Sequence, residues 1–369
     1  MKFRVVQWAT GNLGRAAIEG IVSHPELELV GVWVHSDSKV GKDAGELAGR
    51  PDLDTGVKAT GDIDALLALQ PDCILYSPLM PDEEQIIRFL QCGINVVTPL
   101  GWFYPKDLDT SALDAACVVG KTTLHGTGIH PGGVTEKWPL IMSGFSRDVT
   151  YVSCEEYSDC RTYGAPDVLH DIMLFGKTPE EAKDSFMLKF LGAGFSQSVH
   201  MIADAMGFVL DGPLQATHDI ALATAPIDTP MGIIKPGLLA AQRFRWQGLV
   251  DGTPVIKAET NWYMGTENIE ADWFDAKSIE KNGECFAMTV EGDPPVYITT
   301  HGVHPARDMD WAEVQKRNPG MVATAMHCVN SIPVVCEASS GIKTYLDLPM
   351  VVGKAKVSGE YVLVSHRGR

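Results

Sequence analysis

The chain has few basic residues for its size and an excess of acidic ones. Its 30 Lys and Arg side chains stand against 47 Asp and Glu, so the formal net charge of the 369 residues is -17. Nucleic acids and anionic membrane surfaces attract basic patches, and this balance therefore argues against both as partners. A phosphate-bearing cofactor is not excluded, because backbone amides can bind phosphate locally.

Long apolar runs and leader-like features are also scarce. No apolar run reaches the ~18 residues that a membrane span requires. The first apolar run, Phe3 to Trp8, is only as long as a strand and contains Arg4 and Gln7, which does not predict a signal peptide. These absences predict a cytoplasmic protein that has no membrane partner.

Cysteine pairs with metal or redox spacing are missing as well. The eight cysteines include no C-x-x-C pair, and most lie in apolar runs. They predict buried free thiols in a reducing cytosol rather than disulfides or zinc ligands. His301 and His304 are three residues apart, but no third ligand with matching spacing is evident, so no metal is predicted.

The most informative stretch that is present lies at the beginning, FRVVQWATGNLGR. It predicts a strand, a tight turn and a helix. The small residues Ala9, Gly11 and Gly14 occupy the three positions of the dinucleotide fingerprint G-x-G-x-x-G, with alanine in the first. The middle position must stay bare so that the backbone can approach a pyrophosphate, while the last allows close helix-strand packing. A plain strand-turn-helix is the alternative.

Further strands and helices alternate over the first 126 residues. Strands are expected at 27–34, 72–76, 94–98 and 122–125, and helices at 15–22, 62–69, 81–92 and 111–118. This alternation predicts a Rossmann-type, doubly wound parallel sheet. The ligand of such a sheet lies beyond the carboxyl ends of its strands, here the loops 9–14, 35–42, 77–80, 98–105 and 126–133.

The pattern changes after Pro131. A strand is expected at 149–156, a long helix at 185–209, and strands at 218–223, 240–249, 253–262 and 287–298. These elements predict an α+β domain with a mostly antiparallel sheet. A helix at 320–330, ended by Ile332-Pro333, should pack back on the first domain. The predicted division is a dinucleotide-binding domain at 1–130, a substrate and dimerisation domain at 131–310, and a returning segment at 311–369.

The loop after the second strand bears on the choice of cofactor. An acidic residue ~20 residues past the fingerprint would bind the ribose hydroxyls of NAD. His35, Ser36 and Lys39 stand there instead, and they suit a 2'-phosphate better. NADP is therefore predicted, while Asp37 keeps NAD possible. Solvated loop residues without a role are the alternative for His35 and Lys39.

Two loops hold candidate substrate and catalytic residues. Trp102, Phe103 and Tyr104 are consecutive aromatics, so they cannot share one core face. They form either a pocket wall, with Tyr104 as a hydroxyl donor, or a packing surface between domains. In GTGIHPGG, His130 is a candidate general acid and substrate ligand, with a purely structural role as the alternative.

The long helix at 185–209 and its surroundings carry a stripe of large apolar side chains. Such a stripe is typical of a core, but it would also suit an apolar substrate pocket or a dimer face. Its members are Phe186, Met187, Phe190, Phe195, Met201, Met206 and Phe208.

Several of these motifs together resemble a known family. WATGNLGR, SKVGKDAGEL, NVVTPLGWFYP, GTGIHPG and TAMHCVNSIP, with DLP at Asp347 to Pro349, are similar to dihydrodipicolinate-reductase-like oxidoreductases. The closer branch holds 2,4-diaminopentanoate dehydrogenase and the native amine dehydrogenases. The likeness covers the first domain and the C-terminal segment well, and the middle only generally. It implies NAD(P), a Rossmann domain, a second domain with a sheet, and a homodimer.

Two departures from the family pattern affect the expected reaction. The histidine pair and lysine motif of dihydrodipicolinate reductases are absent, which argues against the lysine-pathway reaction. The amine dehydrogenase branch has two glutamates that position and deprotonate ammonia, and their places fall at Leu100 and Gly101 here. His130 stands where that branch often has asparagine.

These observations predict an NAD(P)H-dependent oxidoreductase that transfers hydride to the C=O group of a small or medium, largely apolar substrate. His130 or Tyr104 would supply the proton, and Trp102, Phe103 and His130 would bind the substrate. Amine dehydrogenase or imine reductase chemistry with another carboxylate, Glu155 or Glu156, is one alternative. A non-catalytic NADP(H)-binding protein is another. The residues predicted to bind the cofactor are Ala9, Thr10, Gly11, Asn12, Leu13, Gly14, His35, Ser36, Lys39, Ser77, Leu79, Thr98, Pro99, Leu100, Gly128 and Asn330.

Overall fold

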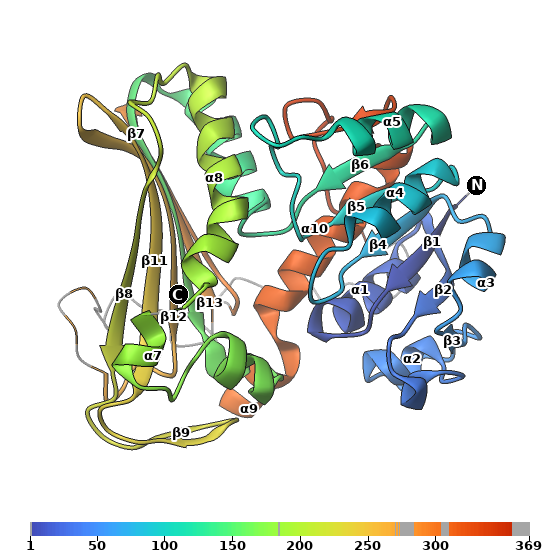
Figure 1. Cartoon of the computed structure of the whole chain (residues 1–369), viewed down its shortest axis with the longest axis horizontal. Coiled ribbons are helices and arrows are strands. Elements are labelled where there is room, and N and C mark those ends of the chain that lie inside the picture. The colour runs from blue at the N-terminus through green and yellow to red at the C-terminus, as the bar shows by residue number, and fades with distance from the viewer. Residues whose placement is uncertain are drawn as a thin grey trace, which may run out of the picture.

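The structure is a computed structural model that describes residues 2–183, 185–269, 271, 273, 284–303 and 310–355. Two sheets dominate these residues (Figure 1). A seven-stranded sheet is built mainly from the N-terminal third of the chain, and a six-stranded sheet from its middle. Helix α8 (Met187–Met206) lies between the six-stranded sheet and the first sheet with its helices (Figure 1).

The seven-stranded sheet is parallel throughout, in the order β15-β6-β5-β4-β1-β2-β3. Helices cover both faces, which explains why its central strands are nearly continuous apolar runs. One face packs against α1 and α10, and the other against α3, α4 and α5. The predicted doubly wound sheet is thus confirmed. The elements are β1 (Phe3–Trp8), α1 (Asn12–Ser23), β2 (Leu27–Trp33), α2 (Ala44–Ala48), β3 (Ala59–Thr60), α3 (Ile63–Ala68), β4 (Cys73–Tyr76), α4 (Glu83–Gln91), β5 (Asn95–Thr98), α5 (Ser111–Gly120), β6 (Thr123–Gly126) and β15 (Gly341–Ile342).

The C-terminal helix α10 (Pro319–Cys336) returns to this sheet. It packs on α1, β4, β5 and β6, and β15 after it pairs with β6. The helix continues through Pro333, so its predicted end at Ile332-Pro333 was wrong. Ile332, Pro333 and Val335 are buried, and this packing holds the last turn although proline donates no hydrogen bond there. The three-part division of the chain stays a prediction.

One helical stretch, Trp311–Cys336, is long and apolar enough by length and composition to cross a membrane. It comprises α9 (Trp311–Arg317) and α10. The apolar side chains of α10 pack into the core between α1 and the parallel sheet, as the core helix of a folded domain does.

The six-stranded sheet has the order β14-β13-β7-β12-β11-β8, and only the β12-β7 pair is parallel. The prediction of a mostly antiparallel second sheet is confirmed. Apolar residues of β7, β11 and β12 face α8 and form one core with it. The elements are α6 (Trp138–Met142), β7 (Arg147–Asp159), α7 (Pro179–Lys183), α8, β8 (Gln215–Leu222), β9 (Ile227–Thr229), β10 (Gly232–Ile234), β11 (Leu239–Val250), β12 (Thr253–Tyr263), β13 (Glu284–Asp293) and β14 (Val296–His301).

Two boundaries in this region differ from the expectation. The single strand predicted at 287–298 is a hairpin, β13 and β14, in which Val290 pairs with Val296. Pro294 and Pro295 separate the two strands, since proline cannot continue a ladder. The long helix ends at Met206 because Gly207 adopts a left-handed φ of 82°.

Candidate active site

The fingerprint turn joins β1 to α1. Ala9 has a φ of 73°, and Gly11 precedes the first helical residue. A Cβ on Gly14 would lie 2.2 Å from the carbonyl oxygen of Ala9, so only glycine permits this close approach. The side-chain amide of Gln7 donates to the carbonyl of Ala9 (2.9 Å) and to Oγ of Ser77 (2.9 Å). The turn is therefore tied to the end of β4.

The space above the turn fits the phosphates of a dinucleotide. A Cβ on Gly11 would meet no atom of the described residues within 4 Å, and no side chain caps α1. Its first amides and the positive end of its dipole are thus open to an anion. Lys39 adds a positive charge, because its Nζ donates to Oγ1 of Thr10 (3.1 Å). Asn12 and Leu13 form the first turn of the same helix.

His35 and Ser36 follow β2 beside this turn. The His35 ring lies 6.1 Å from the ring of Trp33, and Oγ of Ser36 hydrogen-bonds to Oγ of Ser38 (2.8 Å). Both side chains belong to the loop that carries Lys39 towards Thr10. Their predicted contact with a 2'-phosphate stays a prediction.

The predicted nicotinamide loops meet at the ends of β5 and β6. The amide of Thr127 donates to the carbonyl of Thr98 (2.8 Å), and a Cβ on Gly128 would lie 3.6 Å from Cβ of Pro99. Leu100 follows on the same loop, where its amide donates to Oγ1 of Thr98 (3.2 Å). On the neighbouring loop, Ser77 hydrogen-bonds to the carbonyl of Trp8 and Leu79 is exposed.

Asn330 is not brought to this group. It lies on α10 in a cavity with Lys2, Ser23 and Lys354. Lys2 precedes β1, so this cavity is at the amino ends of the strands, opposite to the fingerprint turn. α10 begins at Pro319, 296 residues after α1 ends at Ser23, and this separation in the sequence gave no hint of which end of α10 faces the loops.

A cavity of about 570 Å³ lies between the β5-α5 loop and α8. The aromatic loop residues Trp102 and Phe103 line it and are 8% and 2% exposed. From α8, the predicted stripe contributes Phe190 and Phe195, while Met187 and Met201 are buried. The aromatic loop therefore forms the wall of a largely apolar cavity.

The hydroxyl of Tyr104 points to α8. It donates to Oδ2 of Asp204 (2.8 Å), and its backbone amide donates to Oε1 of Gln197 (2.9 Å). Burial and the hydrogen bond to Asp204 raise the pKa of Tyr104 to about 12. Its proton is thus engaged by a carboxylate in this arrangement.

His130 has protein partners on both ring nitrogens. Nε2 lies 3.0 Å from the backbone carbonyl of Glu259, which can only accept, so Nε2 carries the proton. Nδ1 accepts from Oγ1 of Thr135 (2.8 Å). The ring also packs edge-on against Phe195, and burial lowers the pKa of His130 to about 4. A neutral imidazole held at both nitrogens has no free proton for a substrate.

Another candidate for proton transfer, besides Tyr104 and His130, is a carboxyl group on β7. Glu156 is next to Phe286 of β13 in register, and the His130 and Phe286 rings are 6.2 Å apart. Its Oε2 accepts from Oγ1 of Thr260 (2.8 Å). Burial, and then the charge of Glu284, raise the pKa of Glu156 to about 8.

Glu284 lies on the same sheet face and was not foreseen. Its Oε1 accepts from Oγ of Ser158 (3.1 Å), and a Cβ on Gly320 at the start of α10 would collide with its carboxyl group. Burial raises the pKa of Glu284 to about 7. The two carboxyl groups therefore face the elements that return to the first sheet. Only the pairing of β7 with β13, which are more than 120 residues apart, reveals their proximity.

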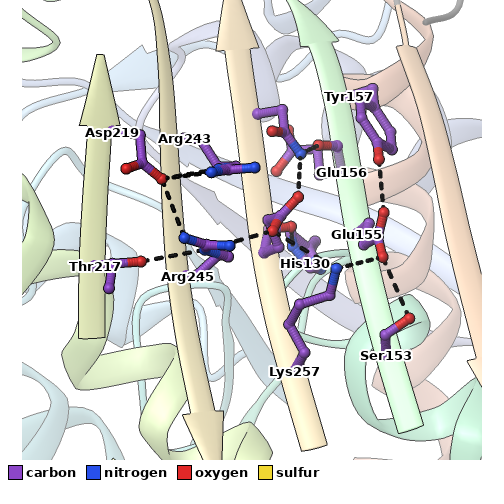
Figure 2. A network of polar contacts seen from close by, with 12 residues as sticks. His130, Ser153, Glu155, Glu156, Tyr157, Thr217, Asp219, Arg243, Arg245 and Lys257 are labelled. Atoms are coloured by element: carbon purple, nitrogen blue, oxygen red, sulfur yellow. Dashed lines mark hydrogen bonds and ion pairs between the residues drawn. The ribbon is translucent and has the colours of Figure 1, made fainter. Parts of the chain in front are cut away.

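Glu155 points to the opposite face, because successive residues of a strand alternate. Its Oε1 lies 2.7 Å from Nζ of Lys257, and its Oε2 accepts from the hydroxyl of Tyr157 (2.6 Å). Figure 2 shows this pair in a polar network that continues across β12 and β11 to Arg245 and Asp219. Lys257 helps to hold the pKa of Glu155 below its usual value, against the effect of burial.

Among the described residues, no three His, Cys, Asp or Glu side chains are grouped so that they could hold a metal ion. His304, the second histidine of the pair considered from the sequence, lies outside those residues.

Residues 136–360 match the family model described as the 2,4-diaminopentanoate dehydrogenase C-terminal domain. An amine dehydrogenase from Streptomyces virginiae is 32% identical over 94% of this chain and 96% of its own length. A 2,4-diaminopentanoate dehydrogenase from Acetoanaerobium sticklandii is 26% identical over 95% of this chain and 94% of its own length.

A solved structure shares the fold over nearly the whole chain. An amine dehydrogenase from Mycobacterium smegmatis superposes with a TM-score of 0.74 at 19% identity, covering 96% of this chain and 98% of that protein. The fingerprint turn, the two sheets and these relatives all point to the same family. The chain belongs to the family of 2,4-diaminopentanoate dehydrogenases and amine dehydrogenases and is an NAD(P)-dependent oxidoreductase.

Proposed function

We propose that this protein interconverts an amine and the corresponding C=N or C=O compound, with Glu156 as the proton-transferring residue. The observation that carries this proposal is a carboxyl group with a pKa near 8 on the sheet face towards the cofactor loops. The amine dehydrogenase relatives support the substrate class.

The cofactor residues divide into two groups. Gly11, Asn12 and Lys39 would hold the phosphates, and Thr98 to Leu100 with Gly128 would flank the nicotinamide. When bound, the nicotinamide supplies or accepts the hydride. The residues near Thr10 favour NADP, because Lys39, which has no ion pair with an acid among the described residues, suits a 2'-phosphate.

Glu156 suits both directions of the reaction. At pH 7 it is mainly protonated, since its pKa is about 8, and it can donate a proton in the reductive direction. At higher pH it is a carboxylate and can accept a proton from an ammonium group. The hydroxyl of Thr260 orients the carboxyl group through Oε2. In this proposal Glu156 takes the role of the two glutamates of the amine dehydrogenase branch, whose places fall at Leu100 and Gly101 in this chain. That the chain lacks those two glutamates stays a prediction.

Plain carbonyl reduction with His130 or Tyr104 as the acid has less support. Tyr104 donates its proton to Asp204, and His130 donates its own to the carbonyl of Glu259. Either residue would have to give up a hydrogen bond before it could serve a substrate. We propose instead that His130 is a positioning residue that fixes the loop after β6 against β12.

The cavity beside α8 suits an apolar substituent of the substrate. Its walls are Leu100, Trp102, Phe103, Phe190 and Phe195. Several polar groups at its margin already have protein partners, as Tyr104 has with Gln197 and Asp204 and His200 has with Asp107. A ligand group that offers no hydrogen bonds would leave none of them unsatisfied.

The test is oxidation of a panel of alkyl and aryl amines with NAD+ and NADP+, and reduction of the matching ketones with and without ammonium. Amine oxidation, and ketone turnover that depends on ammonium, are expected. Ketone reduction that ammonium does not accelerate would overturn the amine assignment. Turnover of neither class, with the cofactor still bound, would favour a non-catalytic binding protein.

We also propose that the protein acts as a homodimer in the cytoplasm. The resemblance to the family supports a dimer, and the acidic, reduced-thiol composition supports the location. Sedimentation of the purified chain tests whether it is a dimer.

A further inference from the structure

We infer that Asp204 is a specificity-determining residue, which clamps the β5-α5 loop onto α8 and thereby sets the width of the apolar cavity. This inference rests on the proposed function in one respect, because the cavity is taken to hold the substituent of the substrate. The clamp itself is a property of the fold.

Asp204 accepts hydrogen bonds from two residues of the β5-α5 loop. Its Oδ2 accepts from the hydroxyl of Tyr104 (2.8 Å) and from Nζ of Lys106 (2.7 Å). Both donors come from the loop, whereas Asp204 is in the last turns of α8. One carboxylate therefore connects two loop residues to the helix.

Two further contacts support the same junction. The backbone amide of Tyr104 donates to Oε1 of Gln197, and Nδ1 of His200 lies 3.4 Å from Oδ2 of Asp107. Gln197 is also fixed within α8, since its Nε2 donates to the carbonyl of Ala193 (2.7 Å). The contacts of Tyr104 with Gln197 and of Asp107 with His200 thus both run between the loop and α8.

The inner end of the loop is anchored differently. A Cβ on Gly126 would lie 2.0 Å from the carbonyl oxygen of Gly101 and 2.8 Å from the nitrogen of Phe103, so the loop backbone rests directly on β6. Its inner end is thus fixed by close backbone packing. Its outer end, at Tyr104 to Asp107, is connected to α8 through the polar contacts described above.

The cavity lies between these two anchors. Leu100 to Tyr104 form one wall and residues 190–200 of α8 form the other. On the α8 side, a Cβ on Gly194 would lie 3.3 Å from the ring of Phe103. The distance between the loop and α8 therefore decides how large a group fits between them.

The clamp can be opened without unfolding the protein. The side chains of Lys106 and Asp204 are 41% and 38% exposed, and pairs of such exposure are weak and screened by salt. Without Asp204 the outer end of the loop loses the contacts of Tyr104 and Lys106 and keeps those to Gln197 and His200, so it can move away from α8 more easily. Short substituents then lose contacts, while long ones gain room.

The experiment compares Asp204→Asn and Asp204→Ala with the wild-type enzyme on a series of n-alkylamines. The ratio of kcat/KM for the longest to that for the shortest amine should rise about tenfold in Asp204→Ala and by less in Asp204→Asn, whose amide oxygen can still accept a hydrogen bond from the loop. The change should lie in KM, with the Kd for NADPH unchanged. The control is Glu313→Gln, which breaks an equally exposed pair with Arg317 in α9 and should leave the ratio unchanged.

A second variant acts in the opposite direction. Gly194→Ala adds a methyl group against Phe103 and Pro131 without touching the clamp. It should lower the same ratio. If both Asp204 variants keep the wild-type ratio, Asp204 does not determine specificity and the inference is wrong.

Hydrogen exchange separates this inference from the proposed function. In Asp204→Ala the amides of residues 99–108 should exchange faster than in the wild type, and high salt should reduce the difference. This readout needs no substrate. Faster exchange without turnover of any amine or ketone would support the clamp and overturn the proposed function. Unchanged exchange in this segment would overturn the clamp.

Discussion

Glu155 and Glu156 are adjacent in β7, yet their carboxyl groups lie on opposite faces of the six-stranded sheet. The first contacts Lys257, and the second accepts from Thr260 beside Glu284. One has a lowered pKa and the other a pKa raised to about 8. Because the two residues are neighbours in the chain but differ in their partners and in their pKa values, a variant of Glu155 is a matched control for a variant of Glu156.

Glu156→Gln should lower kcat/KM for amine oxidation by about 10²–10⁴-fold, the usual contribution of a general acid or base. The amide keeps the acceptor for Thr260 but cannot transfer a proton. In the wild type, oxidation should rise as the pH increases through about 8, and this limb should be missing from the variant. Glu155→Gln is the control, and an equal loss in that variant would contradict the assignment.

The stability of the protein should fall as the pH rises from about 6.5 to 8. Burial raises the pKa values of Glu136 and Glu156 to about 8 and that of Glu284 to about 7, so the folded state binds more protons than the unfolded state in this range. Buried His125, His130 and His327 have lowered pKa values and act oppositely, but only below their ordinary value of 6.5. Urea unfolding at several pH values measures the slope. Glu136→Gln should flatten it, and a slope of opposite sign would show that these carboxyl groups are ionised.

Gly11→Val should abolish the binding of NADPH and leave the fold intact. A Cβ at this position meets no described atom within 4 Å, so the valine side chain would extend into the space over the start of α1. Fluorescence titration measures binding, and the melting temperature without cofactor should stay close to that of the wild type. Gly14→Val is the contrast, because its Cβ would collide with Ala9 and should destabilise the fold itself. Wild-type affinity for NADPH in Gly11→Val would show that the phosphates do not bind at this turn.

NADPH should bind more tightly than NADH by at least about tenfold, which corresponds to ~1.4 kcal/mol. Lys39→Ala should reduce this preference, because its Nζ lies beside Thr10 at the fingerprint turn. Dissociation constants of both cofactors for both proteins provide the measurement. Equal constants in the wild type would indicate that Asp37, rather than Lys39, decides the choice.

Lys257→Met should destabilise the fold by about 3 kcal/mol, the usual cost of leaving a buried carboxylate without its partner. Lys257 forms an ion pair with Glu155 at 2.7 Å, and Figure 2 shows the two side chains pointing toward one another. It also lies 3.6 Å from Glu259, whose side chain is 6% exposed. Chemical denaturation measures the loss. Adding Glu155→Gln to this variant should restore part of the lost stability. If the double variant instead loses as much stability as the two single variants added together, the two groups are not coupled.

Patterns within a few residues were sufficient for much of this protein. The alternation of apolar strands and amphipathic helices predicted the parallel sheet, and the turn with Ala9, Gly11 and Gly14 predicted the dinucleotide site. These features are local, because the strand, the turn and the helix are each specified by neighbouring residues. The same local reasoning left Trp102 and Phe103 as either a pocket wall or a packing surface between domains, and their place in the wall of the apolar cavity came from the structure.

The partners of each polar group were decided only by the tertiary structure. Tyr104 meets Asp204 a hundred residues later, His130 meets the carbonyl of Glu259, and Glu156 meets Glu284. Sequence spacing carries no signal for such contacts, since strand order and the packing of α8 bring them together. Whether a histidine, tyrosine or glutamate can transfer a proton depends on those partners and on burial. The fold class could therefore be derived from the sequence, whereas the candidate acid and base emerged only from the packed structure.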